Sequence, residues 1–166
     1  MSGEPAPAVG VDPALFRHVL GHWATGVALV TAVVDGRPEG LVVNSLTSVS
    51  LAPPLVAFSA SRTSLTWSRM RRAARLGVNV LPGDAEPFAR RASAPGADRF
   101  DATAWRKTHG GVPALCGALA FLECVPEATH PAGDHWIVVA RVEEARAGPA
   151  GGPLVFWRGG YRTIAH

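Results

Sequence analysis

The sequence predicts a mainly β protein in which about three helices lie at the periphery of a β-barrel. Seven or eight short segments are rich in apolar and β-branched residues and are bounded by glycine, proline or aspartate. Three other segments have helical spacing or helix-start residues, and they do not alternate regularly with the strands. A doubly wound parallel sheet requires that alternation, so a barrel is the favoured architecture.

The first helix is expected to begin at an N-cap formed by Asp12, with a proline directly after it. Apolar residues at helical spacing continue from there, which places the end of this helix near Ala24. A second helix is expected to begin within residues 61–64 and to run to about Arg75, with Gly77 just beyond its end.

The strands are predicted from runs of β-branched and apolar residues. Asp35-Gly36 is a hairpin turn signal between the first two runs. Later, a polar connection passes through Trp105 and His109, and Pro131 marks a turn. The expected strands are residues 27–34, 40–44, 46–51, 55–59, 78–81, 115–125, 136–147 and 154–157. A short helix is expected at 84–91, between the fifth and sixth of these strands.

Length and composition fit one folding unit. With 166 residues, the chain has the size of a single domain and can bury a core without disulfides or a structural metal. We expect residues 12–166 to form this domain. Residues 1–11 are rich in proline, glycine and alanine, and we expect them to be a flexible tail.

Charge, hydropathy and cysteine content exclude several classes of partner. The formal net charge is only +3, and no recognised nucleic-acid-binding motif accompanies the arginines clustered between Arg62 and Arg75. The longest apolar run, residues 26–34, is too short to span a membrane. Cys116 and Cys124 are expected on one extended strand, about 26 Å apart, which excludes a disulfide between them. We therefore expect a cytoplasmic protein with no nucleic-acid or membrane partner.

Several enzyme motifs are absent from the sequence. It contains no glycine-rich dinucleotide or phosphate-binding motif, and no serine of the nucleophile-elbow type. His18 and His22 have a metal-ligand spacing, but no third ligand accompanies them, so no metal site is expected. Carboxylates paired for acid–base work are not evident. These absences favour an enzyme in which a cofactor supplies the chemistry.

Three polar segments lie between the apolar strands. Residues 44–50 carry one amide and four hydroxyl side chains, which suit a flavin's ribityl chain, although a serine- and threonine-rich edge strand has the same composition. Residues 60–64 place hydroxyl groups and Arg62 at a helix start, where they can bind an anion or simply cap the helix. Gly133-Asp134-His135 offers a histidine that either contacts a ligand or is an ordinary loop residue.

Together these segments resemble the short-chain flavin reductases that serve two-component flavin monooxygenases. The resemblance covers about residues 14–164, and three positions depart from it: Val42, Leu46 and Ala52 stand where threonine, an aromatic residue and aspartate are common. The most specific matching stretch is Asn44-Ser45-x-Thr47-Ser48-Val49-Ser50-x-x-Pro53-Pro54. The other matching stretches are Phe16-Arg17, Thr25-Gly26-Val27, Val30-Thr31, Val78-Asn79-Val80-Leu81, Phe100, Leu119-Ala120-x-Leu122-Glu123-Cys124 and Gly133-Asp134-His135.

The resemblance implies a split β-barrel of the FMN-binding, Greek-key-like kind, with FMN or FAD at the interface of a homodimer. It also implies that NADH or NADPH is the hydride donor and that free reduced flavin leaves for a separate monooxygenase. Two alternatives remain open. One is a split-barrel protein that binds flavin, haem or deazaflavin without nicotinamide-dependent turnover, and the other is a flavin-dependent enzyme with its own organic substrate. The Gly133-Asp134-His135 segment favours the reductase.

The resemblance also implies the site residues, by matching positions. The catalytic residues are His135, at the nicotinamide, and Asp134 beside it. Near the flavin phosphate lie Ser61, Arg62 and Ser64. The remaining cofactor-binding residues are Asn44, Ser45, Leu46 and Thr47 around the ring and the ribityl chain, and Asn79, Val80 and Phe100 as further flavin-side positions.

Overall fold

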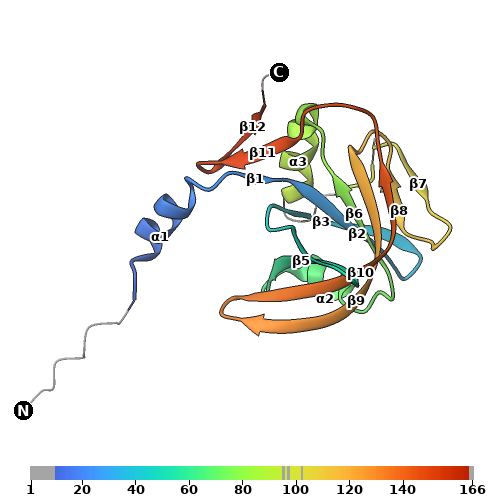
Figure 1. Cartoon of the computed structure of the whole chain (residues 1–166), viewed down its shortest axis with the longest axis horizontal. Helices are drawn as coiled ribbons and strands as arrows, with labels where there is room; N and C mark the ends of the chain where they lie inside the picture. Colours follow the sequence, from blue (N-terminus) through green and yellow to red (C-terminus); the bar gives the residue numbers. More distant parts are fainter. Residues whose placement is uncertain (1–9, 95, 97, 102, 165–166) are drawn as a thin grey trace, which may run out of the picture.

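Antiparallel strands are the main type of secondary structure among the described residues of the computed structural model, which confirms the mainly β prediction. The structure describes residues 10–94, 96, 98–101 and 103–164, so most of the expected tail at 1–11 lies outside the described residues. The helices are α1 (Pro13–Leu20), α2 (Leu65–Met70), the short 3-10 helix η1 (Gly83–Ala85) and α3 (Glu86–Ser93). The strands (Figure 1) are β1 (Thr25–Gly26), β2 (Ala28–Val34), β3 (Arg37–Val43), β4 (Thr47–Leu51), β5 (Pro54–Ser61), β6 (Leu76–Val80), β7 (Trp105–Lys107), β8 (Pro113–Leu115), β9 (Ala120–Ala132), β10 (His135–Ala147), β11 (Leu154–Trp157) and β12 (Gly160–Thr163).

The main sheet has seven strands in the order β3-β2-β6-β9-β10-β5-β4, and each adjacent pair is antiparallel. Its two outermost strands, β3 and β4, are joined by residues 44–46 alone, so the sheet must curve to bring its edges together. Ser45 stabilises this closure, because its hydroxyl accepts a 2.8 Å hydrogen bond from the amide of Ser59 in β5. A second sheet, β1-β11-β12, and a small β7-β8 hairpin complete the fold.

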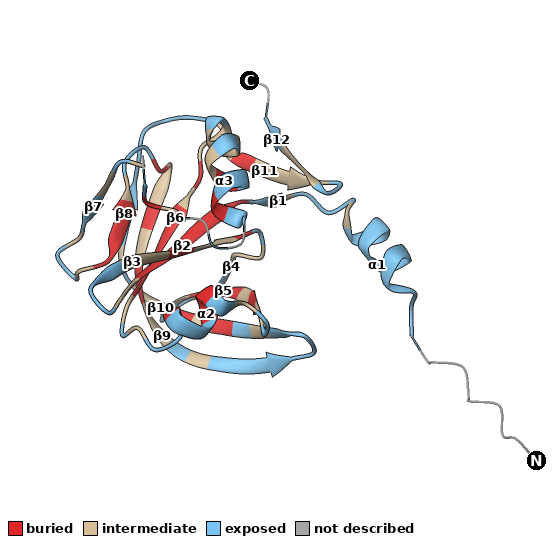
Figure 2. Ribbon diagram, turned by 180° about the vertical axis from the view of Figure 1, so that it is seen from behind, coloured by how far each residue is buried: buried red, intermediate tan, exposed pale blue. Residues whose placement is uncertain are grey.

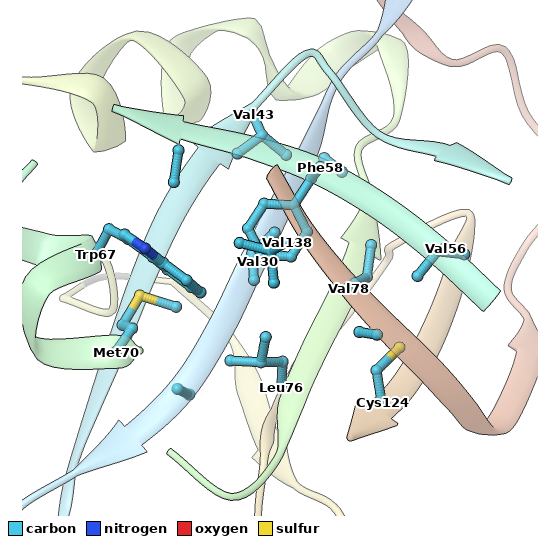
Figure 3. Close-up of a cluster of buried hydrophobic side chains, with 14 residues drawn as sticks. Val30, Val43, Val56, Phe58, Trp67, Met70, Leu76, Val78, Cys124 and Val138 are labelled. Carbon is cyan, nitrogen blue, oxygen red and sulfur yellow. The ribbon is translucent and has the colours of Figure 1, made fainter. Parts of the chain in front are cut away.

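The core lies on both sides of β2, which explains why its sequence is a continuous apolar run and does not alternate. Val30 faces the main cluster of buried residues, and Leu29 faces a second one. In the main cluster, Phe58 of β5 and Trp67 of α2 meet edge to face with ring centres 5.5 Å apart (Figure 3). Buried residues concentrate where β2, β6, β10 and β5 face the interior, whereas α1 is exposed along its length (Figure 2).

The first helix matches the sequence prediction at its start and not at its end. Asp12 is the N-cap, and its carboxylate accepts hydrogen bonds from the amides of residues 14 and 15. The helix ends at Leu20, short of the predicted Ala24. There the amide of Gly21 donates to Arg17, and its carbonyl accepts from the amide of residue 158, which fixes the chain to the β11–β12 turn.

The second helix is also shorter than predicted, because it ends at Met70 and not near Arg75. Gly77, expected to follow the helix, instead lies inside β6. A Cβ atom at this position would overlap the Thr31 hydroxyl and would lie 3.1 Å from the carbonyl oxygen of Pro113. Close packing of β6 against β2 and β8 therefore explains why a glycine stands here. This glycine does not end a helix.

The strand predicted at 115–125 consists of two strands, β8 and β9, separated at Gly117, where φ is +85°. Cys116 lies outside both, so the prediction that the two cysteines share one extended strand was wrong. Both are nevertheless free thiols, Cys116 exposed and Cys124 buried. Pro131 was expected in a turn, but β9 continues through it to Ala132.

Three short strands, β1, β7 and β12, were not predicted. Each has two to four residues and is held by pairing with a distant or neighbouring strand, not by its own composition. Within the described residues, no helix is long and apolar enough to cross a membrane.

Candidate functional site

The tip of the β9–β10 hairpin carries the predicted catalytic pair. Ala132 pairs with His135, so Gly133 and Asp134 form a two-residue turn, and Gly133 adopts a φ of +59° that a residue with a side chain rarely takes. Within the turn, Asp134 Oδ1 lies 2.7 Å from His135 Nδ1. Both side chains are accessible, with exposed fractions of 94% and 46%.

The hydrogen bond between Asp134 and His135 lowers the pKa of the carboxylate and orients the imidazole ring. Hydrogen bonding to His135, followed by the charges of His135 and Arg17, lowers the pKa of Asp134 below its usual value. An ionised carboxylate can only accept, so Nδ1 of His135 carries the proton that it donates. Nε2 is then the imidazole atom available to a ligand, and the carboxylate fixes the orientation of the ring.

Strand pairing places the helix-start segment beside this hairpin, although the two are far apart in the sequence. In the β5–β10 ladder, Ser61 lies directly opposite His135. The amide of Arg62 donates a 2.9 Å hydrogen bond to the carbonyl of Asp134. The Ser61 hydroxyl lies 2.9 Å from that of Thr63, so two hydroxyl groups meet next to the imidazole.

The hydroxyl-rich segment reaches the same surface through β4. Thr47 pairs with Ala57 of β5. Ser59 and Ser61 lie two and four residues further along the same strand. Since paired residues share a face and successive residues alternate, Thr47, Ser61 and His135 point to the same side of the sheet. Thr47 is exposed, as is Asn44, just beyond the end of β3.

Ser45 and Leu46 have structural contacts that limit their part in a site. The Ser45 hydroxyl is bonded to the backbone of Ser59, and Leu46 packs against the main core cluster. They therefore fix the connection between β3 and β4 from which Asn44 and Thr47 project. Ser64 has a similar role as the N-cap of α2, where its hydroxyl accepts a 3.1 Å hydrogen bond from the amide of Trp67.

The guanidinium group of Arg62 lies apart from the Ser61 hydroxyl. It stacks over Trp136, 5.1 Å from the ring centre, and Nη1 donates a 3.3 Å hydrogen bond to the carbonyl of Gly133. Trp136 follows His135 in β10 and so projects from the opposite face. The sequence prediction placed Ser61 and Arg62 near one phosphate. In the structure the Arg62 guanidinium lies over Trp136, whose side chain projects from the face opposite Ser61 and His135.

The side chain of Asn79, predicted from the sequence as a flavin-side residue, is held by hydrogen bonds within the core. It is fully buried, and its amide nitrogen donates to the carbonyl of Leu29 and to the Thr31 hydroxyl, while its oxygen accepts from the amide of Leu115. These three bonds satisfy the amide within the core. Asn79 therefore holds β2, β6 and β8 together.

The other two flavin-side positions predicted from the sequence are less enclosed. Val80 is half-buried at the end of β6. Phe100 is 9% exposed and meets Trp105 with ring centres 5.5 Å apart. Phe100 also lines a hollow of about 640 Å³ whose other walls include Leu65 and Thr66, the residues directly after Ser64. The wall of this hollow thus begins at the first turn of α2, directly after the segment predicted to bind the phosphate.

The sequence prediction did not include Trp136 among the residues near the site. Trp136 was treated only as a strand residue, yet it receives the guanidinium groups of Arg62 and Arg71, the latter 5.7 Å from the ring centre. Such contacts join residues far apart in the chain and leave no local signal.

In the part of the chain that the structure describes, no group of three or more histidine, cysteine, aspartate or glutamate side chains could hold a metal ion.

The chain forms a curved antiparallel barrel with a hydroxyl-rich strand edge and an Asp-His hairpin tip on one face. This arrangement places it in the class of split-barrel flavin proteins. Residues 20–165 match the family model described as a flavin reductase like domain, and the chain belongs to this family. The family and the fold predicted from the sequence are therefore confirmed.

Individual relatives agree with this assignment. The chain is 40% identical over 156 residues to a flavin reductase of Pseudomonas putida, covering 93% of this chain and 92% of the relative. It is 36% identical to HsaB, the reductase subunit of a flavin-dependent monooxygenase of Rhodococcus jostii, covering 99% and 85%. The solved structure of SgcE6, an NADH:FAD oxidoreductase of Streptomyces globisporus, superposes with a TM-score of 0.86 at 36% identity, covering 96% and 98%.

Proposed function

We propose that this protein is an NAD(P)H-dependent flavin reductase that transfers hydride from NADH or NADPH to FMN or FAD. The observation that carries the proposal is the 2.7 Å contact between Asp134 and His135, on the same face as Ser61 and Thr47. A flavin carrier needs only to hold its cofactor, whereas a reductase must also position a second ligand. An imidazole with one nitrogen held by a carboxylate and the other free is suited to that positioning.

The groups on this face fit a flavin nucleotide. Thr47 and Asn44 are exposed at the strand edge, and the Ser61 and Thr63 hydroxyls meet near the hairpin tip. Hydroxyl and amide groups both donate and accept, as a polyhydroxylated chain and a phosphate require. The bound flavin supplies the hydride acceptor, and the protein contributes binding, orientation and exclusion of water.

The roles of the hairpin residues follow from their contacts. Asp134 holds Nδ1 of His135, so Nε2 can hydrogen-bond a nicotinamide nucleotide on the exposed side of the sheet. The backbone bond from Arg62 to Asp134, together with the guanidinium bond to Gly133, fixes the turn against β5. The chain thus positions the second ligand without itself exchanging electrons.

The reduced flavin is proposed to leave for a separate monooxygenase. The Rhodococcus jostii relative is a reductase subunit of a flavin-dependent monooxygenase, and the chain covers 85% of its length. The two free thiols, Cys116 and Cys124, support a reducing, cytoplasmic location. One domain from residue 12 onwards accounts for this activity.

A homodimer is also proposed, from the uncovered apolar face of α1. None of the residues of α1 is buried, and the helix extends away from the barrel (Figures 1 and 2). Its exposed apolar residues, with Trp23 just after it, are Leu15, Phe16, Val19 and Leu20. A second copy of the chain would cover this face. Light scattering should show a dimer for the native chain and a monomer for Phe16→Asp.

The activity is tested by following the absorbance of NADH and NADPH with purified protein, added FMN or FAD, and air. Flavin-dependent oxidation is expected, and the four combinations reveal the preferred donor and the preferred flavin. Tight flavin binding without turnover would instead support a carrier, or an enzyme that requires its own organic substrate.

A further inference from the structure

We propose that a pocket between α3 and the β8–β9 connection binds a small aromatic carboxylate, with the ring against Phe88 and Leu115 and the carboxylate at Arg91. The pocket has a volume of about 360 Å³, which lies in the usual range for a small-molecule site. None of the residues that line it is among the positions predicted to bind flavin or nicotinamide. The inference therefore adds a second binding site and does not depend on the proposed reductase activity.

The inner wall of the pocket is apolar. Leu81, directly after β6, is almost fully buried, whereas Phe88 of α3 and Leu115 of β8 are half-buried. Leu81 belongs to the second cluster of buried residues, and the other two side chains pack against that cluster. The core therefore fixes this wall, and a planar ring can lie against it without displacing a side chain.

Arg91 supplies a positive charge at this pocket. Its guanidinium carbon lies 5.7 Å from the ring centre of Phe88, and Nη2 lies 3.4 Å from the hydroxyl of Thr103. Neither neighbour carries a charge, and no carboxylate of the described residues forms an ion pair with Arg91. The preceding residue, Arg90, is instead paired with Glu86 at 2.7 Å. The planar guanidinium of Arg91 can therefore bind a carboxylate through two parallel hydrogen bonds.

The contact between Arg91 and Phe88 favours a ligand in which charge and ring are close together. Because the guanidinium lies over the phenylalanine ring, a carboxylate bound to it holds the adjoining atoms of the ligand beside the apolar wall. A benzoate-like acid has its carboxylate one bond from the ring and satisfies both surfaces. An inorganic anion would leave the apolar wall uncovered, and a neutral aromatic compound would leave the charge of Arg91 unmatched.

Asp84 limits the negative charge that the pocket can accept. This exposed residue lines the same pocket as Arg91. A ligand with several negative charges, such as a nucleotide, would be repelled by the carboxylate of Asp84. A monocarboxylate matches the single free cation with the least repulsion.

Cys116 provides a way to observe the pocket directly. Its thiol is exposed and the residue lines the pocket, so a bound ligand should shield it from a reagent. The chain has two cysteines, and the other, Cys124, is buried. The rapid alkylation of the folded protein therefore reports on Cys116 alone.

The test measures how fast iodoacetamide, an uncharged reagent, alkylates Cys116 in the full-length protein with increasing sodium benzoate. We expect saturating benzoate to slow alkylation by roughly threefold or more. Benzamide, which has the same ring without the charge, should protect far less. In Arg91→Gln, the half-saturating benzoate concentration should rise by roughly tenfold. It should fall by roughly two- to threefold in Asp84→Asn.

Arg90→Gln is the matched control, because it removes the same charge from the neighbouring position of α3. Its half-saturating benzoate concentration should equal that of the native protein. Equal effects of Arg90→Gln and Arg91→Gln would reduce the interaction to the general charge of the helix and overturn the inference.

The native protein alone also decides the question, whether or not the variants fold. Alkylation that does not slow up to about 50 mM benzoate would exclude the site. Equal protection by benzamide would remove the carboxylate from it, and competition between FMN and benzoate would assign the pocket to the flavin site. Protection by benzoate in a protein without reductase turnover would support the inference while the proposed function failed.

Discussion

Glu123 Oε2 accepts a 2.8 Å hydrogen bond from the hydroxyl of Thr108, joining β9 to the loop of the β7–β8 hairpin. The carboxylate is almost fully buried, and its other oxygen lies 3.0 Å from Nη1 of Arg75. The loop therefore closes over a charged group, and its backbone must pass very close to that group.

Gly110 is the residue at which this passage is closest, and Gly110→Ala tests it. A Cβ atom there would overlap the Glu123 carboxylate, so the loop must lift or the ion pair must break. We expect a loss of about 2–4 kcal/mol and a Tm lower by roughly 5–10 °C in a calorimetric scan. Gly26→Ala is the control, because no atom lies within 4 Å of the Cβ position. Equal Tm values for the two variants would contradict the close approach.

Glu143 links acid stability to the same arginine. Hydrogen bonds from Arg75 and then Arg141 lower the pKa of Glu143 in the folded protein. A depressed folded pKa stabilises the fold above the unfolded value, near 4.3, and this contribution is lost as pH falls through the folded pKa. We expect Glu143→Gln to reduce Tm near neutral pH and to approach the native Tm as the pH falls through the lowered pKa of Glu143. Parallel Tm curves over that range would count against the linkage.

His135→Ala separates a ligand-binding role from a structural one. Because His135 projects from the exposed face of the hairpin, its loss should lower kcat/KM for the nicotinamide by roughly 10- to 100-fold. Flavin affinity, measured by fluorescence quenching, should remain nearly unchanged. An equal loss of both would show that the imidazole acts by holding the hairpin in place.

The two cysteines are expected to differ in reactivity. Burial raises the pKa of the Cys124 thiol to about 12, whereas Cys116 is exposed. Since the thiolate is the reactive form, a chromogenic thiol reagent near pH 8 should titrate one equivalent in the folded protein and two after denaturation. The Cys116→Ser variant should give none until it is unfolded. Two rapid equivalents in the folded native protein would contradict the burial of Cys124.

Local chemistry was sufficient to predict part of the fold. Asp12 begins the first helix as expected, and the Asp35-Gly36 turn has φ values of +49° and +77°, which match its sequence signal. Gly77 and Gly117 were misinterpreted because the reasons for them are not local. Gly77 leaves space for the side chain of Thr31 in another strand. Gly117 ends a strand that its apolar neighbours would otherwise continue.

The candidate site was predictable as a set of segments, but not as an arrangement. Sequence order suggested Ser61, Arg62 and His135 as neighbours of the ligand, yet only the register shows that Ser61 and His135 share a face. The stacking of Arg62 on Trp136 and the burial of Asn79 depend on contacts between distant strands. Single-residue motifs carry no information about which side of a sheet a side chain will occupy.

The two-residue turn at Gly133 and Asp134 has an effect on how the site can evolve. Along β10, odd-numbered positions from 135 to 139 project outward and even-numbered positions project into the core. A slip of β10 by a single residue would bury His135 and expose Trp136, so the site and the core would be lost together. Single substitutions can change the outward-facing residues of β10 one at a time. An insertion or deletion in the turn must instead involve an even number of residues, so that His135 still projects outward and Trp136 inward.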